Sequence, residues 1–282
     1  MTDFFRSYDD FFLLETLPIL IRKTGLDVYD FRFRDLFECR SITQSVPQPV
    51  LLRVGAIDDF ASLASSLNNM GMTLLFTQEQ HERSSMLENW YPLLADYTPF
   101  SRVYERLPPL EQVLQEFTFP IFVKGNRQTG HHKKSQSIIA NAAMYESLAA
   151  QWNTDKYLHW QKAVVRNFVP LKTVDDKSFP DMIPASHEFR IFFWKKRIVG
   201  IGRYWCMVGD YSLDERDRER VLHLAQQAAD IVDVPFLGVD IAKTQDNDWI
   251  VIEVNDGQES GYAGIDRYTL WKTILEVERE LS

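Results

Sequence analysis

The chain has 282 residues, which suits one large or two smaller domains, and 45% of them are hydrophobic, a fraction typical of a globular protein with a sizeable core. Lys and Arg number 31 against 40 Asp and Glu, and this net charge of -9 argues against nucleic-acid binding by the whole surface, although a local basic patch stays compatible with it. The chain has neither an apolar run of the about 18 residues that span a bilayer nor an N-terminal signal pattern, and its two cysteines, Cys39 and Cys206, lack metal-ligand partners, so we expect a soluble cytoplasmic protein.

The first region, residues 1–105, has the pattern of a small α/β domain. Pro49 to Val54 has the composition of a buried strand, and Asp58 to Asn69 repeats apolar residues at helical spacing before Gly71, a common helix end. Thr73 to Thr77 has the composition of a second strand. This order of strand, helix and strand indicates a parallel crossover.

The second region, residues 106–184, begins with a strand from Phe119 to Lys124. A helix over residues 140–152 and a strand over residues 163–169 follow, and Pro170 ends that strand. The remaining segment, from Lys172 to Pro184, is irregular and acidic, which is typical of a surface connection.

Lys124 ends the first of these strands, next to a polar loop from Gly125 to Ser135. The loop has two glycines, no acidic residue and five basic side chains: Arg127, His131, His132, Lys133 and Lys134. In an acidic protein such a run indicates a local anion site, and a lysine at its edge can neutralise a phosphate. A solvated loop beside a lysine that extends to solvent is the alternative. The spacing matches neither the phosphate loop of nucleotide-binding proteins nor a dinucleotide fingerprint.

The third region, residues 185–282, combines hairpins with helices. Strands are expected from Glu188 to Trp194 and from Ile198 to Trp205, with helices from Asp214 to Val232 and from Tyr268 to Leu281. Antiparallel hairpins beside helices distinguish this region from the first.

Arg190 is a charged residue inside the apolar strand, with Glu188 on the same face. A tight turn at Lys196 and Arg197 would place Arg190 opposite Arg203. Opposed like charges destabilise a sheet unless an anion bridges them, so the pair suggests an anion clamp. A salt bridge of Arg190 to Glu188 or Glu253 is the alternative.

A second hairpin carries the most informative acids. Its strands are Val239 to Ala242 and Trp249 to Gly257, and a turn centred between Asp246 and Asn247 places Asp240 opposite Glu253. Asn255 shares the face of Glu253, whereas the apolar residues Ile250, Ile252 and Val254 are expected on the other face. Two carboxylates held together beside an amide oxygen indicate a divalent-metal site, and a solvated acidic surface is the alternative.

The segment after this hairpin contains Gly257, Ser260 and Gly261. Glycines allow backbone amides to approach a substrate oxyanion closely, which suggests substrate binding. An ordinary surface loop is the alternative.

In this order the motifs resemble the ATP-grasp family. The matching segments are Phe122–Lys124, Val165–Val169, Glu188–Phe192, Gly238–Ala242 and Ile252–Gly257. More narrowly, the chain resembles a clade of that family named for one arginine and two lysines. Its features match Arg53, Lys124, Lys134 followed by Ser135, and the tail from Asp256 to Gly261.

The resemblance implies an α+β fold in which an N-terminal α/β domain, 1–105, precedes two α+β lobes, 106–184 and 185–282, that clamp a nucleotide. It also implies roles for individual side chains. Phosphates would be held by Lys124 and Lys134, and adenine would be read by the backbone of Arg166, Asn167, Phe168 and Val169. One or two Mg²⁺ ions, or Mn²⁺, would be held by Asp240, Glu253 and Asn255. The transferring phosphoryl group would be held by Arg190 and Arg203, and the substrate by Arg53, Gly257, Ser260 and Gly261.

The implied activity is that of an ATP-dependent carboxylate-amine ligase, which forms an amide through an acylphosphate on an amino acid, a peptide or a protein terminus. Such a site needs positioning and charge neutralisation but no nucleophilic triad. Two alternatives stay open: an ATP-grasp kinase that phosphorylates a small molecule, and a nucleotide-binding module without turnover. Dimers are common in this fold, so a homodimer is compatible with the resemblance. Two departures weaken the adenine assignment: Arg166 stands where many members have glutamate, and Asn167 where the clade often has an acid.

Overall fold

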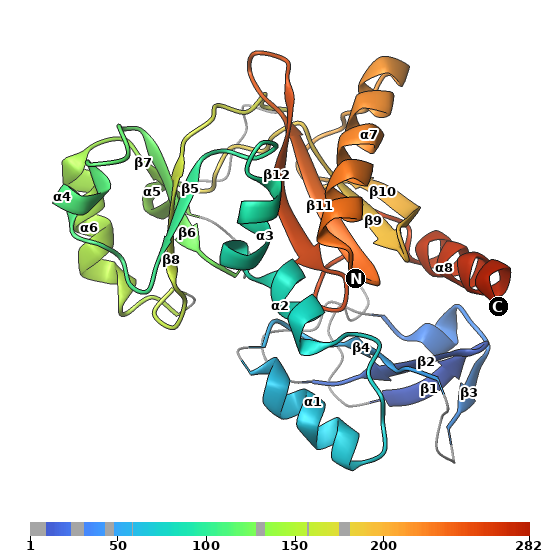
Figure 1. The fold of residues 1–282 in the computed structure, drawn as a ribbon. Coiled ribbons are helices and arrows are strands. Elements are labelled where there is room, and N and C mark those ends of the chain that lie inside the picture. Colours follow the sequence, from blue (N-terminus) through green and yellow to red (C-terminus); the bar gives the residue numbers. More distant parts are fainter. Residues whose placement is uncertain are drawn as a thin grey trace.

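The computed structural model describes residues 10–23, 31–42, 48–57, 59–127, 133–156, 158–174 and 181–282. In these parts of the chain, the structure contains three separate four-stranded sheets, and helices lie beside each of them (Figure 1). The arrangement confirms the predicted α+β class. No helix in the described ranges has the length and apolar character needed to cross a bilayer.

The N-terminal sheet has the strand order β3-β1-β2-β4. Its strands are β1 (Asp10–Leu14), β2 (Leu17–Ile21), β3 (Cys39–Ser41) and β4 (Leu51–Arg53). The helical segments of this part are η1 (Phe33–Asp35), α1 (Phe60–Asn69), α2 (Gln78–Ser85) and α3 (Leu87–Leu94). β4 pairs in parallel with β2, and Asp59 caps α1 by accepting from the backbone of Ser62 at 2.8 Å.

The prediction of a strand at residues 73–77 is wrong. Within this segment only Leu74 pairs, through an isolated parallel bridge to Val50. The physical reason is the helix that follows. Thr77 and Gln80 form a capping box at the start of α2, so the chain has to turn out of the extended conformation there. The parallel direction of the crossover is nevertheless confirmed by the Val50–Leu74 bridge. Asp58, the expected start of the preceding helix, lies outside the described residues.

The central sheet has the order β5-β8-β6-β7. Its elements are β5 (Ser101–Tyr104), β6 (Ile121–Gly125), β7 (Ile138–Ile139), β8 (Ala163–Asn167), α4 (Leu110–Val113), α5 (Lys134–Ser137) and α6 (Ala142–Trp152). A separate apolar cluster that includes Tyr145 and Trp152 of α6 supports this lobe. β5 pairs with β8, so residues 101–104 belong to this sheet although they precede the boundary expected at 105.

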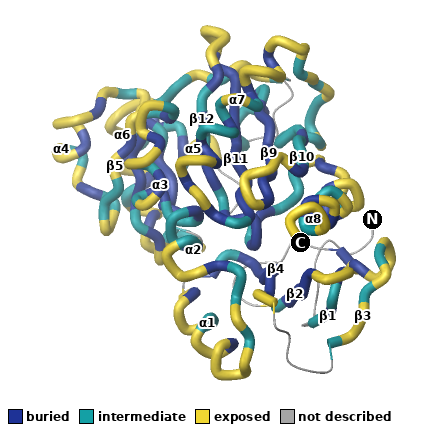
Figure 2. The backbone as a smooth tube through the Cα atoms, turned by 45° about the vertical axis from the view of Figure 1, so that its right-hand side comes forward, coloured by how far each residue is buried: buried dark blue, intermediate teal, exposed yellow. Residues whose placement is uncertain are grey.

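The C-terminal sheet has the order β10-β9-β11-β12. Its elements are β9 (Glu188–Trp194), β10 (Arg197–Arg203), β11 (Phe236–Lys243), β12 (Trp249–Asp256), α7 (Glu215–Val232) and α8 (Arg267–Leu281). Every residue of β9 and β11 is buried, and both strands lie within the molecule in Figure 2. These central strands are rich in β-branched and aromatic residues, as expected where both faces are covered.

Two contacts hold β12, one to the segment between α3 and β5 and one to β8 of the central sheet. The backbone N–H of Val251 in β12 donates to the carbonyl of Tyr97 at 2.9 Å. Arg166 of β8 donates through Nη1 to the carbonyl of Ile252 at 2.9 Å. β12 therefore lies beside β8, and the residues between them form the walls of the cavity described next.

Candidate functional site

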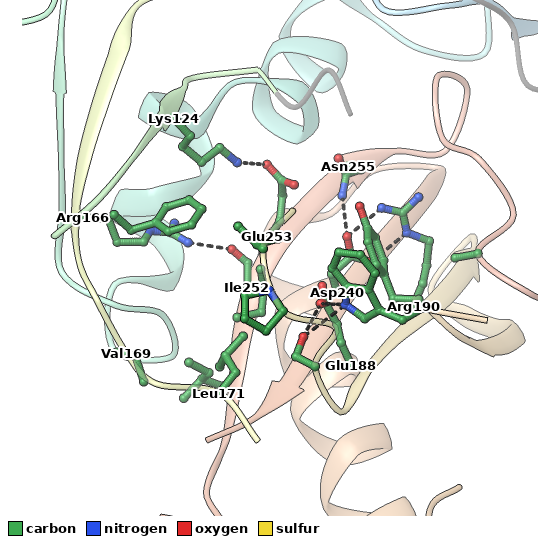
Figure 3. Close-up of a pocket in the computed structure, with 18 of the residues that line it drawn as sticks. Lys124, Arg166, Val169, Leu171, Glu188, Arg190, Asp240, Ile252, Glu253 and Asn255 are labelled. Carbon is green, nitrogen blue, oxygen red and sulfur yellow. Dashed lines mark hydrogen bonds and ion pairs between the residues drawn. The ribbon is translucent and has the colours of Figure 1, made fainter. Parts of the chain in front are cut away.

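A cavity of about 1180 Å³ lies between the central and C-terminal sheets and extends to the N-terminal part. One part of its wall is largely apolar and includes Phe122, Val169, Leu171, Ile250 and Ile252. The charged part brings Lys124, Arg190, Asp240, Glu253 and Asn255 together (Figure 3). The predicted metal trio and two of the predicted cationic residues thus line one space.

Lys124, at the end of β6, forms a hydrogen-bonded ion pair with Glu253 of β12. The side chains are 4% and 7% exposed, so neither charge is solvated by bulk water. Burial lowers the pKa of Lys124, and the attraction of Glu253 opposes this effect. A desolvated ammonium in this position is a strong anchor for an entering phosphate because little water has to be displaced from it.

Asp240 of β11 is held by Arg190 of β9 through a fork of two hydrogen bonds. Nε donates to Oδ1 at 2.7 Å and Nη2 donates to Oδ2 at 2.6 Å. The third nitrogen, Nη1, donates to the carbonyl of Gly261 at 3.0 Å, and the guanidinium lies 5.2 Å from the centre of the Tyr204 ring. Burial alone would lower the pKa of Arg190, but the charge and hydrogen bonds of Asp240 outweigh it and raise the pKa.

The expected pairing of Asp240 with Glu253 is confirmed, but the hairpin reaches it differently. Lys243 pairs with Trp249, so the turn is centred on Asp246, and a β-bulge then shifts the register so that Asp240 faces Glu253. The bulge also overturns the expected sidedness of Ile250 and Ile252: both line the cavity on the same side as Glu253. Val254 is buried in the core, on the opposite side, as expected.

The expected opposition of Arg190 and Arg203 is wrong. The turn falls one residue earlier, at Lys195 and Lys196, which have left-handed φ values of 46° and 67°. A bulge then places Arg190 opposite Gly202. A shift of one residue reverses the face of a strand, so Arg203 forms an ion pair with Asp210, partly exposed and outside the cavity lining.

Sequence reasoning missed Glu188 and Tyr204 as cavity residues, although it placed Glu188 on the face of Arg190. Glu188 accepts hydrogen bonds from Ser186 Oγ and Trp205 Nε1, each at 2.9 Å. Burial raises the pKa of Glu188 to about 7, and the negative charge of Asp240 adds to this effect. The alternation of charged residues along β9 was the available signal.

The predicted adenine segment, Arg166 to Val169, lines the cavity. Its arginine side chain is a structural link: Nε donates to Ser101 Oγ at 2.8 Å, and Nη1 reaches β12 as described above. Burial lowers the pKa of Arg166 to about 10. The strand ends at Asn167, and Phe168 and Val169 follow it; all three line the cavity together with Phe122, so their backbone borders an apolar space suited to a planar ring.

Lys134, the second predicted phosphate lysine, is exposed and does not belong to the cavity lining. It begins the short helix α5, where its backbone N–H donates to the carbonyl of Asp181 at 2.8 Å and Ser135 N donates to Asp181 Oδ1 at 2.9 Å. These contacts fix the start of α5, and Lys134 stays outside the cavity lining to which Lys124 belongs. Residues 128–132 of the expected anion loop, which include His131 and His132, lie outside the described residues.

Arg53 lies behind the predicted substrate loop instead of facing the cavity. It donates to the backbone carbonyls of Gly257 and, at 3.1 Å, of Ser260, and its side chain is buried. The N–H of Gly257 is already paired with the carbonyl of Phe236 at 2.9 Å, so Gly257 is not a free oxyanion donor. Ser260 and Gly261 do line the cavity.

The donor set around Asp240 and Glu253 fits Mg²⁺ or Mn²⁺, which prefer carboxylate and amide oxygens. Asn255 donates through Nδ2 to Asp240 Oδ2 at 3.2 Å, an orientation that turns its oxygen away from Asp240. No group of three or more His, Cys, Asp or Glu side chains suited to a metal occurs in the described ranges. Asn255 and the phosphates of a nucleotide would therefore have to complete the ligands of such an ion.

Comparisons with known proteins agree on the class. A protein-family model matches residues 76–274, and it describes an ATP-grasp domain of family 3 in the clade named for one arginine and two lysines. A comparison with curated protein sequences gave no match. Among solved structures, the chain is similar to a RimK domain protein ATP-grasp from Sphaerobacter thermophilus DSM 20745, with a TM-score of 0.57 and 14% identity over 81% of this chain and 80% of that one. It is also similar to the VanG D-Ala:D-Ser ligase from Enterococcus faecalis, with a TM-score of 0.56 and 12% identity over 84% and 70% of the two chains.

The fold and the cavity define an ATP-grasp protein. Because the family model covers more than half of the sequence, the chain belongs to family 3 of the ATP-grasp clade named for one arginine and two lysines.

Proposed function

We propose that the protein is an ATP-dependent carboxylate-amine ligase. The observation that carries the proposal is the convergence of two buried ion pairs, Lys124–Glu253 and Arg190–Asp240, on one cavity between two lobes. Cations that are desolvated and fixed in place can receive the negative charge of a triphosphate and of the phosphoryl group in transfer. The similarity to the VanG D-Ala:D-Ser ligase supports this reaction type, and at 12% identity the substrate is left to experiment.

In the proposed reaction, a carboxylate oxygen of the substrate attacks the γ-phosphorus of ATP and ADP leaves. The amine of a second substrate then attacks the acylphosphate carbon, so that a C–N bond forms, inorganic phosphate departs and the amine loses a proton. Lys124 would bind phosphate oxygens, Arg190 would hold the transferred group, and Asp240, Glu253 and Asn255 would hold Mg²⁺ or Mn²⁺. The ion would neutralise charge on the phosphates. The apolar wall beside Phe168 and Val169 would hold adenine.

Hydroxylamine gives a direct test because it intercepts an acylphosphate as a hydroxamate but leaves a phosphate ester intact. Purified protein is incubated with ATP, Mg²⁺ and pooled amino acids or dipeptides, and ADP and hydroxamate are measured together. We expect hydroxamate to appear in proportion to ADP. ADP without hydroxamate, with a stable phosphate ester instead, would assign the kinase reaction.

Replacing Glu253 with Gln tests the site itself. The variant keeps the shape of the side chain but removes the charge that pairs with Lys124 and would face the metal. We expect loss of ADP formation while the far-UV circular dichroism is retained. Glu116→Gln is the matched control, because this glutamate pairs with Arg102 at the exposed surface. Full turnover by the Glu253 variant would contradict the metal assignment.

A further inference from the structure

We propose that Arg127 and Glu259 form a subsite for the charged end of a free α-amino acid substrate, with the carboxylate bound by Arg127 and the ammonium by Glu259. The inference rests on the proposed ligase function and names one of its substrates. Both residues line the cavity, together with Ser85 and Ser260. Arg127 lies two residues after the end of β6, and Glu259 lies in the segment after β12.

The hydrogen bonds of Arg127 are incomplete. Its Nη2 donates to both carboxylate oxygens of Glu259, at 3.0 Å and 2.9 Å. Its Nε and Nη1 are buried and have no hydrogen-bond partner among the residues that the structure describes. The side chain is only 5% exposed, so bulk water does not compensate for the missing acceptors.

Arg190, in the same cavity, differs from Arg127 in having a partner on every nitrogen. All three of its nitrogens donate, two to Asp240 and one to the carbonyl of Gly261. A buried guanidinium that lacks acceptors is costly, and an anionic ligand removes this cost by supplying charged acceptors. Arg127 thus has the unused donors that a substrate carboxylate would satisfy.

The backbone is held by hydrogen bonds at Arg127 and at the residue before it. The N–H of Arg127 donates to Gln161 Oε1 at 3.0 Å. The preceding residue, Asn126, accepts through its carbonyl from Leu87 N at 3.1 Å and donates through Nδ2 to Glu88 at 2.9 Å. The guanidinium is therefore presented from a rigid support, as a specific binding site requires.

Glu259 decides between a phosphate and an amino acid as the ligand. A polyphosphate beside Arg127 would be repelled by this carboxylate, whereas the ammonium of a zwitterion would be attracted. One oxygen of Glu259 is also bound at 3.2 Å by Ile57 N, and the other is reached by Ser85 Oγ only at 3.4 Å. The second oxygen keeps acceptor capacity for an ammonium group. The contacts with Ile57 and Ser85 also place the pair next to the N-terminal part.

The test measures binding without turnover. Protein saturated with ADP and Mg²⁺ is heated in the presence of pooled L-amino acids, their C-terminal amides or their N-acetyl derivatives, and the unfolding midpoint is recorded at rising ligand concentration. We expect free amino acids to raise the midpoint of the wild-type protein, with an apparent affinity about tenfold or more above those of the amides and the N-acetyl derivatives. Arg127→Met should abolish the preference for the carboxylate, and Glu259→Gln the preference for the ammonium.

Two further variants keep the test conclusive if a single substitution unfolds the protein. Arg127→Met together with Glu259→Met removes both buried charges, so no unpaired charge is left, and the double variant should bind ADP but not amino acids. Arg127→Lys keeps the charge and should retain weak binding. Arg102→Met, which breaks an exposed pair with Glu116, is the matched control and should bind amino acids as the wild type does.

The proposal is overturned if amides bind as well as free amino acids, if Arg127→Met keeps the preference, or if the wild type shows no shift with millimolar amino acids. A loss of ADP affinity in Arg127→Met with amino-acid binding intact would assign Arg127 to the nucleotide phosphates instead. Because the measurement uses ADP, it is independent of the hydroxamate experiment, and the failure of one can be told from the failure of the other.

Discussion

Asp240 and Glu253 lie opposite each other on β11 and β12, yet each carboxylate is paired with a different cation. Arg190, from the neighbouring strand of the same sheet, binds Asp240, whereas Lys124, from the central sheet, binds Glu253. The second ion pair therefore connects two lobes across the cavity. A nucleotide that draws Lys124 toward its phosphates would also change how the lobes are joined.

Breaking the Lys124–Glu253 pair should destabilise the protein. Lys124→Met leaves a buried carboxylate without its partner, and we expect a loss of roughly 3 kcal/mol in the free energy of unfolding. The double variant Lys124→Met/Glu253→Met should lose much less than the sum of the single variants, because both charges are removed together. Urea denaturation of the four proteins gives the coupling. For comparison, Arg102→Met at the exposed pair with Glu116 should cost less than about 1 kcal/mol. Additive losses at the buried pair would show that the interaction is not formed in solution.

Arg190→Lys should retain the charge but lose the two-pronged contact to Asp240. We expect kcat/KM for ADP formation to fall on the order of 100-fold, as when a positioned transition-state donor is removed. Arg203→Lys should cost less than about tenfold, because Arg203 lies outside the cavity and faces Asp210. Equal losses in the two variants would contradict the strand register found here and restore the opposition of both arginines.

The two hairpins show how far sequence reasoning could go. Strand composition and alternation located both hairpins and placed Arg190, Asp240 and Glu253 inside apolar strands. The register could not be obtained in this way, because a bulge in each hairpin shifts it by one residue. In the hairpin of Asp240, the turn and the bulge shift the register in opposite directions, so the predicted pairing with Glu253 is still found. In the hairpin of Arg190, the bulge offsets the earlier turn only in part, so the pairing differs from the predicted one by one residue. Turn centre and bulge depend on packing against other segments, which a local pattern does not contain.

Contacts between distant segments set the remaining limits. Arg53 was predicted to face a substrate, but it supports the carbonyls of Gly257 and Ser260, more than two hundred positions away. Arg127 was recognised only as part of a basic loop, and its partner Glu259 is 132 positions away. The family resemblance singled out Arg53, and the basic composition of its loop singled out Arg127. Their partners follow from how the N-terminal and central parts pack on the segment after β12, and this packing has no periodic signal in the sequence.

Gly257→Ala should destabilise the protein and displace the segment that carries Ser260 and Glu259. A β-carbon at position 257 would lie 2.3 Å from Cγ of Phe236, whose ring is 1% exposed and cannot move aside. Overpacking of this kind costs about 1–3 kcal/mol, which urea denaturation would resolve. Gly209→Ala is the control, since its nearest contact would be an ordinary 3.5 Å, and it should change stability by less than about 0.5 kcal/mol. A neutral Gly257→Ala would mean that the segment is looser than the structure shows.

The buried carboxyl of Glu188 should make stability depend on pH. Its pKa is raised to about 7 from an ordinary value of 4.5, so between these values the native state binds more protons than the unfolded state. The free energy of unfolding should therefore fall as pH rises through this window, by roughly 3 kcal/mol at most for one group. Glu188→Gln removes the titration but can still accept from Ser186 and Trp205. The variant should become progressively more stable than the wild type as pH rises from about 5 to about 8, measured by urea denaturation at each pH. A difference that stays constant across that range would mean that Glu188 is already ionised throughout it in the native protein.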